Sequence, residues 1–135
     1  MAHVNDPAVI RRLLDEPGRW AIVGLSTNTD RTAYGVARFV QRELGKEIVP
    51  VHPKAEAVHG AEGYATLADV PGDIDVVDVF VRSALAGAVV DQAIDAGARA
   101  VWLQLGVVDE EAAARAAAAG LDVVMDTCPV IEARR

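Results

Sequence analysis

The 135-residue sequence is poor in aromatic residues and cysteine, and it lacks a long apolar run. Aromatic residues make up only 4% of the chain, so its core must be aliphatic, which is typical of helices packed on a buried parallel sheet. The lone Cys128 excludes an internal disulfide and favours a reducing, cytoplasmic location. No stretch reaches the roughly 18 apolar residues of a membrane span, and residues 1–16 do not resemble a secretory signal. We therefore expect no membrane partner.

Basic residues are also in the minority. The sequence has 13 Lys and Arg residues and 20 Asp and Glu residues, which gives a formal net charge of −7. Nucleic-acid binders need a basic face, so we expect no nucleic-acid partner, although a local basic cluster can still bind an anion. The 52% of hydrophobic residues excludes disorder, and the 24% of charged residues excludes a membrane protein. The composition is that of one folded domain.

Apolar segments alternate with amphipathic ones along the whole chain. The pattern predicts strands at 20–24, 48–51, 76–81, 100–105 and 121–125. Helices are predicted after Asp6-Pro7, around 36–44, after a Ser83 cap and from Asp109 to Gly120, with a short helical turn at 67–70. This alternation predicts a doubly wound, Rossmann-like α/β domain over residues 1–135. Its five-stranded sheet is mainly parallel, with helices on both faces.

In such sheets a ligand binds beyond the carboxyl ends of the strands. The loop after the first strand contains Gly24, Ser26, Thr27 and Arg31, and it leads into a helix whose N-terminus attracts phosphate. It lacks the G-x-G-x-x-G spacing of dinucleotide-binding loops. An ordinary polar loop with a glycine turn stays open as the alternative.

The loop after the second strand is His52-Pro53-Lys54. An NAD-binding domain places an acidic residue there to hold the ribose hydroxyls, whereas Lys54 would suit a phosphate on the ribose. NADP and coenzyme A both carry such a phosphate. A lone lysine on a surface is as often only solvated.

Several runs together resemble the CoA-binding protein family, which is similar to the nucleotide-binding domain of the succinyl-CoA synthetase alpha subunit. They cover almost the whole chain, in order: Ala21-Ile-Val-Gly-Leu-Ser26 with Asp30-Arg31, Ile48-Val-Pro-Val-His-Pro53, Ile74-Asp-Val-Val-Asp-Val-Phe80, Ala100-Val-Trp-Leu-Gln-Leu-Gly106, Ala119-Gly-Leu-Asp-Val-Val-Met-Asp126 and Cys128-Pro129 with Glu132. The resemblance implies a site for coenzyme A or an acyl-CoA, a small-molecule nucleotide ligand.

The resemblance also implies which residues form the site: Gly24, Ser26, Thr27, Arg31, Tyr34, His52, Pro53, Lys54, Phe80, Val81, Arg82, Gln104, Leu105 and Gly106. The chain departs from the family pattern at threonines 27, 29 and 32, where prolines are common. It also departs at Val81 and Thr127, where basic residues are common. These departures weaken the assignment of contacts to Val81 and Thr127 but not the fold.

We find no catalytic constellation in the sequence, and we predict a binding module rather than an enzyme. His52 and His59 lie seven residues apart with no cysteine nearby, which is not a zinc spacing. Cys128 lies near the expected cleft but has no assignable base, so it is interpreted as a small space-filling residue. Asp75 and Asp78 are interpreted as structural hydrogen-bonding residues or an exposed strand end.

Three functions remain open on the sequence alone. The first is a small cytoplasmic module that holds coenzyme A or an acyl-CoA without transforming it. The second is a fragment of an NADP-type oxidoreductase, which would need catalytic residues that the chain does not show. The third is a subunit that works only with a partner chain, as the synthetase alpha subunit does. A homo-oligomer is also open.

Overall fold

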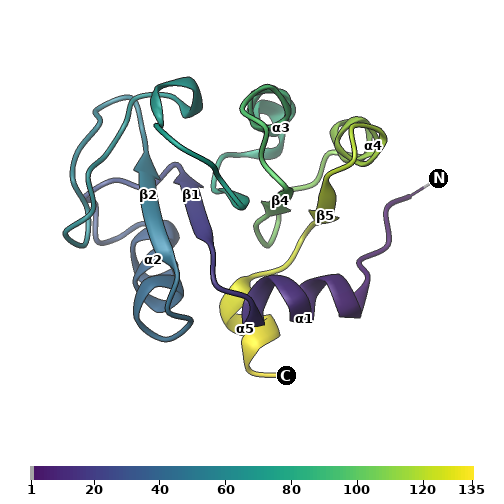
Figure 1. Cartoon of the computed structure of the whole chain (residues 1–135), viewed down its shortest axis with the longest axis horizontal. Coiled ribbons are helices and arrows are strands. Elements are labelled where there is room, and N and C mark those ends of the chain that lie inside the picture. The colour runs from purple at the N-terminus through teal and green to yellow at the C-terminus, as the bar shows by residue number, and fades with distance from the viewer. Residues whose placement is uncertain (1) are drawn as a thin grey trace.

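The computed structural model describes residues 2–135, which form one five-stranded parallel sheet with helices on both faces (Figure 1). All neighbouring strands pair in parallel, in the order β2-β1-β3-β4-β5. The strands are β1 Arg19–Val23, β2 Glu47–Val51, β3 Val76–Val79, β4 Ala100–Leu103 and β5 Asp122–Val124. The predicted α/β fold is confirmed.

The helices lie in two layers. Figure 1 shows α3 and α4 on one side of the sheet, with α1, α2 and α5 on the other. Their bounds are α1 Pro7–Asp15, α2 Thr32–Arg42, α3 Ser83–Asp95, α4 Glu110–Ala118 and α5 Pro129–Ala133, with a short 3-10 helix, η1, at Leu67–Asp69. The chain leaves β1 toward β2 and then returns to place β3 on the other side of β1. The strand order therefore reverses between β1 and β3, which is where ligands bind in open α/β sheets.

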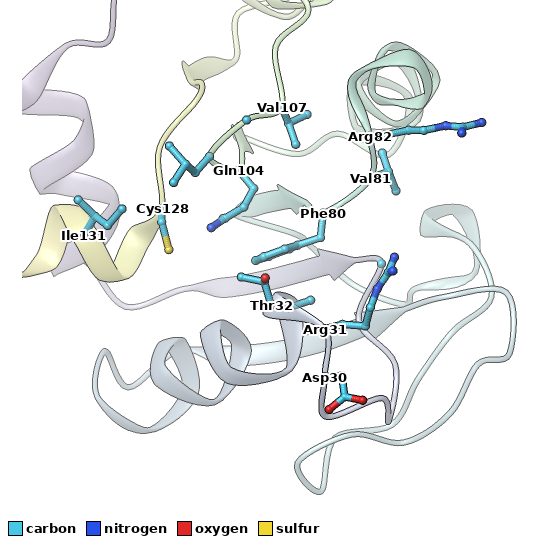
Figure 2. A pocket seen from close by; sticks show the side chains of 14 residues that line it. Asp30, Arg31, Thr32, Phe80, Val81, Arg82, Gln104, Val107, Cys128 and Ile131 are labelled. Atoms are coloured by element: carbon cyan, nitrogen blue, oxygen red, sulfur yellow. The ribbon is translucent and has the colours of Figure 1, made fainter.

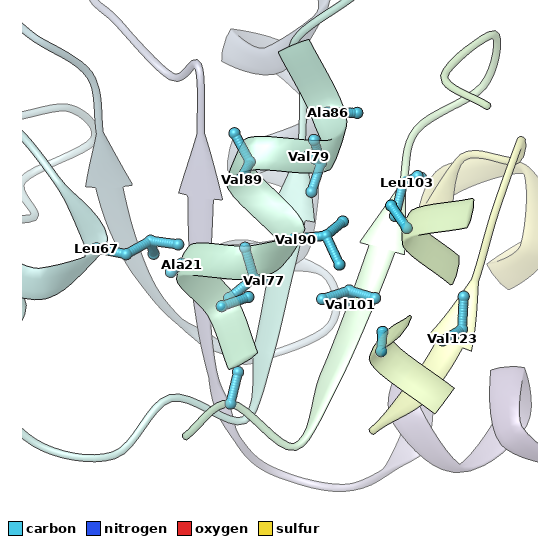
Figure 3. Packing of buried hydrophobic residues seen from close by; sticks show 14 of the residues in the cluster. Ala21, Leu67, Val77, Val79, Ala86, Val89, Val90, Val101, Leu103 and Val123 are labelled. Atoms are coloured by element: carbon cyan, nitrogen blue, oxygen red, sulfur yellow. The ribbon is translucent and has the colours of Figure 1, made fainter. Parts of the chain in front are cut away.

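Alternate residues of each strand point into two hydrophobic cores. Val77, Val90 and Val101 belong to the core under α3 and α4, part of which is drawn in Figure 3. Trp20 and Trp102 belong to the core on the other face, where their ring centroids lie 5.6 Å apart. Trp102 Nε1 also donates a hydrogen bond to the Thr127 carbonyl at 2.9 Å. The two tryptophans thus pack together in one core, and Trp102 fixes the segment that follows β5.

Two local features differ from the sequence-based prediction. Ser83 is the first residue of α3 rather than its cap, and the cap position belongs to Arg82. The Ser83 hydroxyl instead donates to the Gly106 carbonyl at 3.3 Å and accepts from Val108 N at 2.9 Å, which joins α3 to the loop after β4. Helix α5 was not predicted, because five residues starting at a proline are too few to show helical periodicity.

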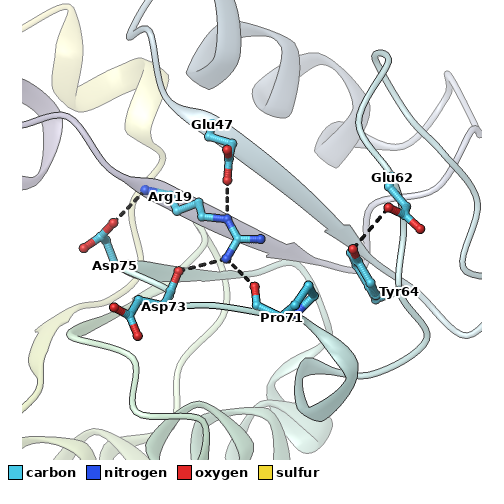
Figure 4. A network of polar contacts seen from close by, with 7 residues as sticks. All are labelled: Arg19, Glu47, Glu62, Tyr64, Pro71, Asp73 and Asp75. Atoms are coloured by element: carbon cyan, nitrogen blue, oxygen red, sulfur yellow. Dashed lines mark hydrogen bonds and ion pairs between the residues drawn. The ribbon is translucent and has the colours of Figure 1, made fainter.

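The amino end of the sheet is closed by a polar network around Arg19 (Figure 4). The Arg19 guanidinium pairs with Glu47 and donates to the carbonyls of Pro71 at 2.7 Å and Asp73 at 2.9 Å. The Asp75 carboxylate accepts from Arg19 N at 2.8 Å, so the structural interpretation of Asp75 is confirmed. Charged groups at this end are therefore engaged with one another.

Candidate functional site

A cleft of about 600 Å³ lies at the carboxyl edge of the sheet (Figure 2). Its volume is within the range of small-molecule sites, roughly 300–1,000 Å³. It is lined by Gly24, Asp30, Arg31, Thr32, Ala33, Phe80, Val81, Arg82, Gln104, Leu105, Gly106, Val107, Cys128 and Ile131. These residues come from the loops after β1, β3, β4 and β5 and from the first turns of α2 and α5, so the cleft lies at the reversal of strand order.

Two arginines stand at one end of the cleft. Arg31 is the residue before α2, and Arg82 is the residue before α3; both have extended backbone and exposed side chains. Within residues 2–135, neither guanidinium has a carboxylate within 4 Å or a hydrogen-bond partner. Both helices also direct unpaired backbone N–H groups toward this end, which favours an anion.

Gly24 and Phe80 bring two strand ends into close contact. Gly24 has a φ of +101°, and a Cβ atom placed on it would lie 2.7 Å from the Phe80 carbonyl oxygen. A side chain at position 24 would therefore collide with the protein backbone before it met any ligand. The Phe80 ring itself faces the cleft between Arg31 and Gln104 (Figure 2).

Gln104 places a polar side chain in the middle of the cleft. Its side chain lies between Phe80 and Cys128 in Figure 2, and the residue is only 5% exposed. Gln104 Oε1 is buried without a hydrogen-bond partner among the described residues. The amide nitrogen of Gln104 is directed toward the cleft in Figure 2, so a bound ligand that offers a carbonyl oxygen would accept a hydrogen bond from it.

The loop after β4 is held in place by Asp126. This residue has a φ of +62°, and its carboxylate accepts a hydrogen bond from Gly106 N at 2.8 Å. The contact links the loops after β4 and β5, which supply Gln104 and Cys128. These two lining residues are thus fixed relative to each other.

Asp78 lies inside the central strand β3. Its exposed fraction is 0%, and its register partners are Ile22 on β1 and Trp102 on β4. Neither carboxylate oxygen has a hydrogen-bond partner among residues 2–135, and the residue is fully buried, so both interpretations of Asp78, structural hydrogen bonding and an exposed strand end, are wrong. Burial raises the pKa of this carboxyl well above its usual value, because the charged form would lose its hydration.

We expect Asp78→Asn to raise the melting temperature at neutral pH by several degrees. The folded state keeps a proton that the unfolded chain releases above about pH 4, so wild-type stability falls as pH rises from there toward the folded-state pKa. Asparagine does not titrate, so the difference in melting temperature between variant and wild type should widen as the pH rises above about 4. Exposed Asp73→Asn is the control, and an equal response of the two variants would refute this expectation.

Eight of the fourteen residues predicted for the site line the cleft: Gly24, Arg31, Phe80, Val81, Arg82, Gln104, Leu105 and Gly106. The other six, Ser26, Thr27, Tyr34, His52, Pro53 and Lys54, do not line it. Thr27 Oγ1 donates to a Glu56 carboxylate oxygen at 3.2 Å, which ties the loop after β1 to the loop after β2. Ser26 Oγ accepts from Asn28 N at 3.2 Å and shapes the same loop.

Tyr34 and the His52-Pro53-Lys54 turn lie on the β2 side of the molecule. The Tyr34 ring packs on His59, with centroids 4.4 Å apart, and its carbonyl contacts His59 Nε2 at 2.8 Å. His52 Nδ1 accepts from Lys54 N at 3.2 Å. Because β2 is the strand next to β1, this turn lies beyond the Arg31 end of the cleft. A ligand that extends past Arg31 along the sheet edge would reach it.

Some lining residues were not predicted. Ala33, Val107 and Ile131 are apolar, and nothing in their types marks them as part of a site. Ile131 belongs to α5, the helix that the sequence did not reveal. Asp30 and Thr32 also line the cleft. They are adjacent in sequence to Arg31, and this adjacency is the feature from which their place in the site could have been predicted.

Metal binding finds no support in the part of the chain that the structure describes. Residues 2–135 contain no group of three or more His, Cys, Asp and Glu side chains placed to hold an ion. Over the same residues, none of the helices has both the length and the apolar character needed to cross a membrane.

Comparison with known proteins finds a matching family and similar proteins along the length of the chain. A family model described as CoA binding domain matches residues 18–134. The uncharacterized protein YneT of Bacillus subtilis is 36% identical over 121 residues, which is 90% of this chain and 89% of that protein. The solved structure of a hypothetical protein from Pyrococcus horikoshii is 35% identical, with a TM-score of 0.89 over 100% of this chain and 98% of that chain. The alpha subunit of an ADP-forming acetate–CoA ligase II from Pyrococcus furiosus is 26% identical over 61 residues, 45% of this chain and 13% of the subunit.

Proposed function

The chain belongs to the family of CoA-binding domains, and on this premise we propose that it binds coenzyme A or an acyl-CoA in the cleft, as a small cytoplasmic module. The observation that carries the proposal is the pair of arginines without carboxylate partners, Arg31 and Arg82, at the starts of two helices that face one cleft. Charge-assisted hydrogen bonds from guanidinium groups and helix N–H groups suit the phosphates of such a ligand.

The order of charged and uncharged groups along coenzyme A matches the order of residues along the sheet edge. Coenzyme A carries its diphosphate and 3′-phosphate at the nucleotide end and its thiol at the end of a long arm with two amides. We place the diphosphate at Arg31 and the 3′-phosphate toward Lys54 on the β2 side. The arm then runs past Gln104 toward Cys128 on the β5 side.

Native mass spectrometry tests binding in the simplest way. The purified protein is incubated with equal amounts of coenzyme A, NAD and NADP and is sprayed from a volatile buffer. We expect one coenzyme A per chain as the dominant complex, because Lys54 replaces the acidic residue that NAD requires. A dominant NADP complex would instead support the oxidoreductase alternative.

We also propose that the isolated chain is not a CoA ligase. The cleft contains no histidine, and a histidine in a further domain does the chemistry in the synthetases that the chain resembles. Incubation with ATP or ADP, an organic acid and coenzyme A should therefore give no thioester. Nucleotide-dependent thioester formation by the chain alone would refute this.

A role within a larger enzyme is the second candidate, favoured by the similarity to a ligase subunit. Native mass measurement of the chain at physiological concentration, together with affinity capture of a stable partner, would distinguish it from the stand-alone module. We expect coenzyme A binding by the isolated chain in both cases.

A further inference from the structure

Cys128 is the single thiol of the chain, and it lies at the opposite end of the cleft from the arginines. It directly precedes α5, and Figure 2 shows its sulfur directed toward the cleft beside Ile131. The residue is only 7% exposed. Reagents can therefore reach the sulfur chiefly through the cleft, so its chemistry should depend on what the cleft holds.

A second, independent observation points to a ligand in this part of the cleft. Gln104, which lies between Phe80 and Cys128, is 95% buried and leaves Oε1 without a donor. Its amide nitrogen is directed toward the cleft in Figure 2, and the amides in the arm of coenzyme A carry carbonyl oxygens that can accept from this N–H group. An arm that passes Gln104 continues toward Cys128, because the two residues follow neighbouring strands, β4 and β5.

The charges of the cleft set the direction of the ligand. Its anionic groups belong at Arg31 and Arg82, so the end without charge extends toward Cys128 and Ile131 (Figure 2). In coenzyme A that end is the sulfur. The two sulfur atoms, one from the protein and one from the ligand, are thereby brought to the same end of one cleft.

We infer that Cys128 exchanges with the disulfide of coenzyme A bound in the cleft, so that the protein carries the coenzyme as a mixed disulfide. This inference rests on the proposed binding of coenzyme A. The cleft then serves as a site of reversible modification in addition to a site of binding, and the modified form depends on the ratio of the disulfide to the free thiol of the coenzyme.

The exchange balances without an outside oxidant. The Cys128 thiol loses its proton, and the thiolate attacks one sulfur of the coenzyme A disulfide. The S–S bond of that disulfide breaks, a new S–S bond forms to Cys128, and the departing coenzyme A thiolate takes up a proton. Free coenzyme A or another thiol reverses the reaction by the same route.

The test follows covalent mass over time with three disulfides: that of coenzyme A, pantethine and oxidised glutathione. Pantethine has the same arm and sulfur but lacks the nucleotide and its phosphates. We expect one adduct per chain, removed by dithiothreitol, and formation from the coenzyme A disulfide at least about tenfold faster than from the other two. The reason is that binding of the phosphates raises the effective concentration of the sulfur at Cys128.

Arg31→Ala serves as the matched variant. It should slow the reaction with coenzyme A disulfide toward the pantethine rate and leave the pantethine rate unchanged, because pantethine has no phosphate for Arg31. Equal rates for all three disulfides in the wild type would overturn the inference, since Cys128 would then be only a generally accessible thiol.

Calorimetry with reduced coenzyme A distinguishes this failure from failure of the proposed function. Tight binding of reduced coenzyme A without a covalent adduct from its disulfide would refute the exchange and leave the binding proposal standing. Absence of both would refute the binding proposal and the exchange with it.

Discussion

Replacing Gly24 with alanine is expected to lower the free energy of unfolding by roughly 2–5 kcal/mol. The backbone at Gly24 has a φ of +101°, which costs a residue with a side chain on the order of 1–2 kcal/mol. The added Cβ would also lie 2.7 Å from the Phe80 carbonyl oxygen, and overpacking of this kind costs about 1–3 kcal/mol more. Urea denaturation followed by circular dichroism measures the loss.

Gly35→Ala is the matched control for this substitution. Gly35 lies within α2, and a Cβ placed there would meet no atom within 4 Å. Alanine at that position should stabilise the domain by about 0.5–1 kcal/mol, because glycine is a poor helix former. If Gly24→Ala proved as stable as Gly35→Ala, the tight contact between the ends of β1 and β3 would not be present in solution.

Replacing Arg31 with alanine is expected to weaken coenzyme A binding about tenfold to a hundredfold. A hydrogen bond to a charged group contributes roughly 1.5–3 kcal/mol, and about 1.4 kcal/mol corresponds to a factor of ten in affinity. Arg31→Lys should recover only part of the loss, because lysine keeps the charge but lacks the planar guanidinium. Isothermal titration calorimetry with each variant gives the dissociation constants.

Arg38→Ala controls for the loss of one positive charge. Arg38 is an exposed residue of α2 outside the cleft, so its removal should leave the affinity for coenzyme A nearly unchanged. The competing interpretation is that Arg31 pairs with Asp30 and only fixes the loop. In the described structure Arg31 has no such ion pair. A lower melting temperature for Arg31→Ala with unchanged affinity would favour the competing interpretation.

The strand and helix pattern allowed the fold to be predicted, because each buried strand is a short apolar run that ends at a turn residue. Trp20–Gly24 and residues 100–105 illustrate this: they were predicted as strands within one or two residues of β1 and β4. Parallel pairing followed from the alternation of strands and helices. Helix α5 escaped prediction because Pro129 and four following residues show no periodicity.

The candidate site was predicted less completely than the fold. Arg31 and Gln104 follow strands and carry polar side chains, so their place at the carboxyl edge could be expected. Burial, in contrast, depends on packing in three dimensions. The sequence around Asp78 does not show that its carboxyl is fully buried without a hydrogen-bond partner. Nor does the sequence show that Tyr34 packs on His59 instead of facing the cleft.

Calorimetric titration of the wild-type protein with coenzyme A, NADP and NAD tests the central claim most directly. The account predicts one coenzyme A bound per chain, at least about tenfold more tightly than either dinucleotide, a difference of about 1.4 kcal/mol or more. The reason is that the first loop lacks the dinucleotide glycines and that Lys54 stands where NAD requires an acid. Binding of NAD as tight as that of coenzyme A, or tighter, would contradict it.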